Sequence, residues 1–87
     1  MEATSFNKIV HAKSRADAVN REISKYLAKQ RKETLFLSRA DFAKKVGVTV
    51  YIVAKWESPG YDFSISDLCK INSVIDIRQF IRELTEE

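Results

Sequence analysis

The stretch "RADFAKKVGVTVYIVAKWE", residues 39–57, constrains the fold more than any other part of the sequence. Gly47 supplies the positive φ angle that a tight turn between two helices needs. Ala43 is small enough to lie where two steeply crossing helices come closest. Beyond the turn, Val53 and Trp56 are spaced so that one face of the second helix carries both into the core. We therefore expect two short helices joined by a turn at Gly47.

Three serines, each followed three positions later by an aspartate, mark helix starts. "SRAD" occurs at residues 14–17 and again at 38–41, and "SISD" occurs at 64–67. A serine N-cap accepts a hydrogen bond from a free N–H of the first turn, and an acid three residues later favours the helix start. We expect helices to begin at about residues 15, 39 and 65, and we interpret the aspartates as capping residues.

A long amphipathic helix is expected from about Arg15 to Glu33, because the pattern repeats every 3.6 residues. Its apolar side, which should lie in the core, comprises Ala16, Val19, Ile23, Tyr26, Leu27 and Gln30. Its opposite side is basic and comprises Arg21, Lys25, Lys29 and Lys32. The basic side faces either solvent or a phosphate-bearing partner.

The central pair of helices can be given bounds from the sequence. The first of the pair is expected over residues 39–46, where Gly47 ends it. Thr49 is expected to cap the second, which then runs through Trp56 or Glu57.

Short linkers flank this pair. In residues 33–37, either Phe36 or Leu37 should fold inward. Residues 58–63 hold the only proline and the second glycine of the chain, which predicts a loop.

Two further helices are expected after the loop. One covers residue 65 to about residue 74 and buries Leu68, Ile71 and the thiol of Cys69. After a break at residues 75–77, the last helix extends from residue 78 to about residue 85. Its apolar residues either pack in the core or form a dimer contact: Ile77, Phe80, Ile81 and Leu84.

Together these segments predict an all-α protein, a compact five-helix bundle with a central helix-turn-helix. A chain of 87 residues suits one domain. We assign the domain to residues 15–87 and interpret residues 1–14 as an N-terminal extension or arm. A short packed extension and a basic arm are alternatives for that segment.

Several classes of protein are not expected. Cys69 and His11 are the only cysteine and histidine, so an intramolecular disulfide and a cysteine or histidine metal site are excluded. The chain lacks the spacings of nucleophile elbows and phosphate loops, so we expect neither an enzyme nor a cofactor. It also lacks an apolar run of the length that a membrane span needs, and we expect no membrane partner and a location in the cytoplasm.

The charge distribution is uneven along the chain. Residues 1–60 hold 12 Lys and Arg against 6 Asp and Glu, whereas residues 61–87 hold 3 against 6. This distribution indicates either a polyanionic partner on the basic part or an ordinary solvated surface.

The central motif resembles the helix-turn-helix family of phage repressors and Cro proteins, the XRE type, often called lambda repressor-like. The resemblance covers residues 37–77, about half of the chain, without a gap. The matching elements are Leu37-Ser38, Ala43, Gly47-Val48, Thr49, Trp56-Glu57, Ser64 and Leu68-Cys69-Lys70-Ile71.

This resemblance implies a function and a DNA-binding site. In such proteins the helix after the turn enters the major groove, and the helix before it crosses the phosphate backbone. The resemblance implies a small sequence-specific transcriptional regulator, a repressor of phage or mobile-element type. It would bind double-stranded DNA as a homodimer, associated with the nucleoid. The implied contacts are Arg39 and Ser58 near the phosphates, and Thr49, Val50, Tyr51 and Lys55 in the groove.

The sequence departs from the family pattern at Val50, where glutamine or arginine commonly makes a bidentate base contact. Val50 offers only apolar contact to a thymine methyl. Val50, Tyr51 and Ile52 together would also suit a protein partner. The alternative function is therefore an antitoxin or anti-regulator, which binds a toxin or other regulator through the same fold.

Overall fold

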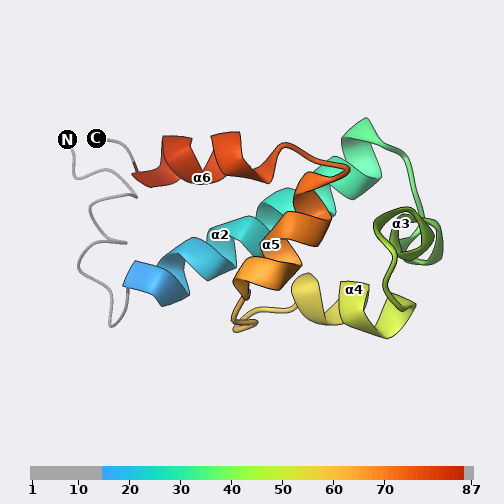
Figure 1. Ribbon diagram of the computed structural model, residues 1–87, viewed down its shortest axis with the longest axis horizontal. Coiled ribbons are helices and arrows are strands. Elements are labelled where there is room, and N and C mark those ends of the chain that lie inside the picture. The colour runs from blue at the N-terminus through green and yellow to red at the C-terminus, as the bar shows by residue number, and fades with distance from the viewer. Residues whose placement is uncertain (1–14, 86–87) are drawn as a thin grey trace.

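The longest helix, α2 (Arg15–Lys29), runs through the middle of the molecule and continues directly as one π-helical turn, η1 (Gln30–Thr34) (Figure 1). The computed structural model describes residues 15–85. The remaining helices are α3 (Arg39–Val46), α4 (Val50–Trp56), α5 (Ile65–Asn72) and α6 (Ile77–Thr85). Over residues 15–85 there are five α-helices and no strand, which confirms the predicted all-α bundle.

The helices form two groups around α2. α3 packs against α4 at one end of the molecule, and α6 packs against both α2 and α5 towards the other end. The helix-turn-helix pair is therefore supported from one side only, and its other side faces solvent.

Two of the predicted serine caps are present. The Ser38 hydroxyl accepts a hydrogen bond from the Asp41 N–H at 3.1 Å, and the Ser64 hydroxyl accepts one from the Asp67 N–H at 3.0 Å. The Asp67 carboxylate in turn accepts the Ser64 N–H at 2.9 Å, which completes a capping box. Burial opposes ionisation of Asp67, but hydrogen bonds from Ser64 and Tyr61 outweigh it and lower the pKa of this carboxyl. The first predicted cap, at residue 14, lies outside the described residues.

The turn between α3 and α4 confirms the prediction for Gly47. This residue has a φ angle of 87°, and its N–H donates to the Ala43 carbonyl at 2.8 Å. Two residues later, the Thr49 hydroxyl accepts a hydrogen bond from the Ile52 N–H at 3.2 Å and caps α4. Ala43 is 3% exposed, consistent with the close approach of the two helices that its small side chain allows.

The end of the first helix differs from the prediction. The sequence predicts an α-helix to Glu33, but the α-helical pattern stops at Lys29 and gives way to the wider turn of η1. The Leu37 N–H reaches back to the Arg31 carbonyl at 2.9 Å and closes this end. Of the two candidates for folding inward, Leu37 packs against the core, whereas Phe36 is 80% exposed.

Phe36 also has an unusual backbone conformation. Its φ angle is 55°, the only positive φ angle among the non-glycine residues from 15 to 85. The left-handed conformation costs an L-residue with a β-carbon about 1–2 kcal/mol. Glycine or asparagine usually occupies such a position after the last turn of a helix.

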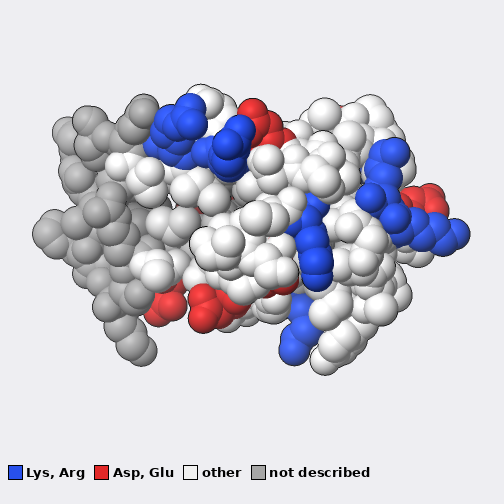
Figure 2. Space-filling view, in the orientation of Figure 1, with Lys and Arg blue, Asp and Glu red and all other residues white. Residues whose placement is uncertain are grey.

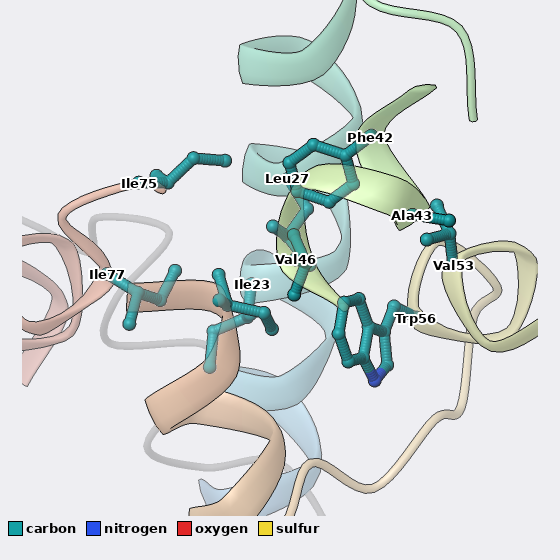
Figure 3. Close-up of a cluster of buried hydrophobic side chains, with 10 residues drawn as sticks. Ile23, Leu27, Phe42, Ala43, Val46, Val53, Trp56, Ile75 and Ile77 are labelled. Carbon is teal, nitrogen blue, oxygen red and sulfur yellow. The ribbon is translucent and has the colours of Figure 1, made fainter. Parts of the chain in front are cut away.

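The core lies where α2 meets the helix-turn-helix and the α5–α6 connection (Figure 3). Trp56 and Val53 are fully buried, as their spacing predicts. The indole N–H of Trp56 has no hydrogen-bond partner of normal geometry. The other large, fully buried side chains are Phe42, Ile23, Leu27, Ile71 and Ile77.

The last helix begins one residue earlier than predicted. Asn72 accepts hydrogen bonds from the N–H groups of Ile77 and Arg78, and Ile77 is buried. Phe80 stacks on Tyr26 of α2, with ring centroids 3.9 Å apart. Burial against α6, followed by the negative charges of Asp76 and Glu83, raises the pKa of Tyr26. Much of the apolar face of α6 is therefore used in the core.

The prediction of a buried thiol at Cys69 is wrong. Cys69 is exposed, because α5 turns Leu68 and Ile71 toward the core and leaves the residue after Leu68 at the surface. Ala16, expected on the apolar side of the first helix, is also exposed. Within residues 15–85, no helix has the length and apolar character needed to cross a membrane. The predictions for residues 1–14 lie outside the described part of the chain.

Gly47→Ala should lower the free energy of unfolding by about 1–2 kcal/mol, because alanine disfavours the positive φ angle of the turn. The added methyl group meets no atom within 4 Å, so the loss measures backbone conformation alone. Urea unfolding followed by circular dichroism gives the value. Gly47→Asn is the control and should lose less, since asparagine tolerates this conformation. Equal stability of the alanine variant and the native protein would contradict the assignment.

Candidate nucleic-acid interface

The outward face of α4 carries most of the predicted site residues. Val50 is 50% exposed and Tyr51 is 65% exposed, and both lie in the first turn. Lys55 is exposed one turn further on, and the capping residue Thr49 is exposed at the start. This face exists because Val53 and Trp56 hold the opposite face of the same helix in the core.

Tyr51 and Lys55 interact on this face. The Lys55 ammonium lies 5.4 Å from the centroid of the Tyr51 ring, a cation–π contact between residues one helical turn apart. The contact keeps the positive charge close to the middle of the exposed face. An apolar surface with a single held cation suits phosphate attraction, and it also suits a protein partner that offers an acid.

Arg39 lies at the start of α3, where the sequence places it, but it is not alone there. Its Nε donates to Glu57 Oε1 at 3.0 Å, and its side chain is 51% exposed. The same carboxylate accepts two hydrogen bonds from Arg31, at 2.6 Å from Nε and 3.0 Å from a terminal nitrogen. Glu57 is 3% exposed and Arg31 is 8% exposed at the side chain. One buried carboxylate thus holds two guanidinium groups.

Arg31 connects this cluster to the linker before α3. It lies in the π-helical turn η1, and its second terminal nitrogen donates to the Leu37 carbonyl at 2.9 Å. Its own carbonyl accepts the Leu37 N–H. The Arg31 side chain therefore fixes both the end of α4 and the approach to α3.

The pairing also determines the protonation of Glu57. Burial by itself would raise the pKa of this carboxyl, but the hydrogen bonds and charges of Arg31 and Arg39 outweigh it and lower the pKa. Glu57 is thus a carboxylate at neutral pH and keeps both arginines in place.

Ser58, the last predicted contact, lies directly after α4. Its hydroxyl donates to the Ala54 carbonyl at 2.8 Å, and its own carbonyl accepts the Ser24 hydroxyl at 3.5 Å. The residue is exposed. Its backbone is thereby tied to α2.

Sequence analysis missed two kinds of residue. Lys44 and Lys45 are exposed in the last turn of α3 and add positive charge to the end of the molecule where α3 lies (Figure 2). Their adjacency was a usable signal. Arg31 was missed because it falls between the apolar and basic stripes of the first helix, and nothing local links it to Glu57, 26 residues away.

The site offers cationic and apolar contacts rather than catalytic chemistry. Over residues 15–85, no group of three or more His, Cys, Asp or Glu side chains is arranged to hold a metal ion. Comparison with protein-family models, curated proteins and solved structures finds no match.

Glu57→Gln should lower the free energy of unfolding by about 3 kcal/mol at neutral pH, because it leaves Arg31 buried without a counter-charge. The exposed pair of Glu22 and Lys25, 3.6 Å apart, provides the matched control. Glu22→Gln should change stability by less than about 0.5 kcal/mol. Chemical denaturation of both variants measures the difference.

The stability gap between the native protein and Glu57→Gln should depend on pH. Because the folded pKa of Glu57 is below its unfolded value, its contribution is complete at neutral pH and is lost as the pH falls through the folded pKa. Denaturation curves from neutral to acidic pH should therefore converge. A gap of constant size would mean that the carboxylate charge does not hold the cluster together.

Proposed function

We propose that this protein is a small sequence-specific DNA-binding regulator, a repressor that inserts α4 into the major groove of operator DNA. The observation that carries the proposal is the outward face of α4. Thr49, Val50, Tyr51 and Lys55 are exposed there on a short helix that is held rigidly from behind by Trp56. A rigid exposed helix after a tight turn suits a groove that admits one α-helix.

The charges near α4 support phosphate contacts. Arg39 keeps its Nε on Glu57, which leaves the exposed part of its guanidinium directed by a fixed bond. Arginine with terminal nitrogens available donates well to phosphate oxygens. Lys44, Lys45 and Lys55 add exposed positive charge on the same two helices. In this proposal, these groups supply the affinity that is common to all DNA sequences.

Sequence preference would come from the first turn of α4. Val50 would contact thymine methyl groups, and Tyr51 would donate or accept one hydrogen bond. Because neither makes a bidentate base contact, DNA shape would carry a larger share of the preference. Bound protein would act by blocking access of the polymerase.

We further propose a homodimer on a two-fold operator, since one module of this size contacts only a half-site. Ile77 is buried and Phe80 and Ile81 pack against the core, so Leu84 and the exposed residues of α5 are the surface left for this contact. Sedimentation at several concentrations distinguishes a monomer from a dimer.

A second function is favoured by the apolar character of the same face. Val50 and Tyr51 are two of the four exposed large hydrophobic residues between residues 15 and 85. An antitoxin or anti-regulator would use them to bind a partner protein. Selection of bound duplexes from a random DNA pool separates the two functions. Enrichment of a palindromic motif supports the repressor, and absence of enrichment together with weak binding at low salt supports the protein partner.

Arg39→Ala should weaken binding to all duplexes alike and reduce the slope of log K against log salt by about 0.9, the value for one phosphate contact. Fluorescence anisotropy across a salt series on two unrelated duplexes measures both effects. Arg82→Ala, on α6, removes an exposed arginine elsewhere and should leave both unchanged. A loss limited to one base pair would assign Arg39 to base readout instead.

Val50→Gln should change the preferred sequence, because glutamine makes the bidentate contact with adenine that valine lacks. The discrimination gained at the contacted base pair should be about 1–3 kcal/mol. Repeating the selection with the variant shows whether the motif changes at one position. An unchanged motif would remove the first turn of α4 from the groove.

A further inference from the structure

Phe36 combines two features that the bundle itself does not require. Its φ angle of 55° is one that glycine or asparagine adopts at low cost. Its side chain is 80% exposed, the highest value among the exposed large hydrophobic residues of the described chain. A strained backbone at an exposed aromatic residue is common at binding sites, where the surrounding structure holds the strain.

The surrounding hydrogen bonds hold Phe36 in this conformation. The Leu35 N–H donates to the Gln30 carbonyl and the Leu37 N–H to the Arg31 carbonyl, both at 2.9 Å. The buried Arg31 guanidinium holds the Leu37 carbonyl from the other side. With Leu35 and Leu37 packed against the core, the residue between them has to project outward.

The position of Phe36 connects it with the proposed phosphate contacts. Ser38, two residues later, caps α3, and Arg39 begins that helix. Lys32, one π-helical turn before Phe36, is exposed, as is Arg39. The aromatic ring therefore extends from a linker with an exposed cation on each side in the sequence. This arrangement of charge favours a polyanion over an apolar protein surface.

We propose that Phe36 is a DNA contact outside the helix-turn-helix, whose ring packs on the deoxyribose backbone of the duplex beside the phosphates bound by Arg39. Side chains that flank phosphate contacts position a protein on DNA without reading sequence. An apolar ring can also press into the minor groove edge at such a place. The contact rests on the proposed DNA-binding function and adds a residue to it.

The test compares variants of Phe36 in the full chain by anisotropy with the selected duplex and with an unrelated duplex. Phe36→Ala should weaken binding to both duplexes about tenfold, the effect of truncating a well-packed interface aromatic residue. The slope of log K against log salt should stay unchanged, because no charge is lost. Phe36→Tyr should retain the native affinity.

A direct contact gives a second readout. In Phe36→Trp, the new indole is exposed, whereas Trp56 is fully buried. Acrylamide should quench the new indole in the free protein, and addition of either duplex should protect it. Continued quenching at saturating DNA would overturn the contact.

Ile65→Ala is the matched control, since Ile65 is 77% exposed on α5. It should bind both duplexes as the native protein does. Phe36→Asn tests the strain, and it should melt at the same temperature as the native protein or higher. A lower melting temperature would mean that the ring stabilises the fold, and would overturn the inference.

The outcomes separate this contact from the proposed function. If the native protein binds no duplex, DNA binding itself fails, and the contact fails with it. If the native protein binds and Phe36→Ala binds equally well, only the Phe36 contact is overturned.

Discussion

The buried ion pair of Arg31 and Glu57 determines how the helix-turn-helix is presented. With an Nε–Oε2 distance of 2.6 Å and both side chains nearly inaccessible, neither charge tolerates loss of the other. The pair ties the end of α4 to the end of the first helix. The same guanidinium holds the Leu37 carbonyl, so it also fixes the linker that leads into α3. The outward face of α4 is exposed as a consequence of this attachment.

The features that the sequence predicted well are those whose chemistry is local. The caps at Ser38, Thr49 and Ser64 involve N–H groups three residues away, and the φ angle of Gly47 depends on the absence of a side chain. The exposure of Tyr51 follows from the burial of Val53 and Trp56 on the other side of a helix with a 3.6-residue period.

Features that depend on distant parts of the chain were missed. Arg31 was not singled out, because its partner lies 26 residues later and only the folded chain brings them together. The π-helical turn was missed because its residues suit an α-helix equally well. Cys69 was placed in the core by its position beside Leu68, whereas the short α5 buries only one narrow face. For the candidate site, exposure was predictable, but the contact of Arg39 with Glu57 was not.

The Glu57 cluster bears on how an apolar helix could serve a DNA-binding protein. Two arginines share one carboxylate, so the cluster keeps one net positive charge. Arg31 is buried and satisfied, and the surplus charge therefore resides on the half-exposed Arg39. A carboxylate that only neutralised Arg39 would weaken attraction to phosphate. One already paired with Arg31 orients Arg39 and leaves its charge effective, so backbone affinity does not require polar base readers on α4.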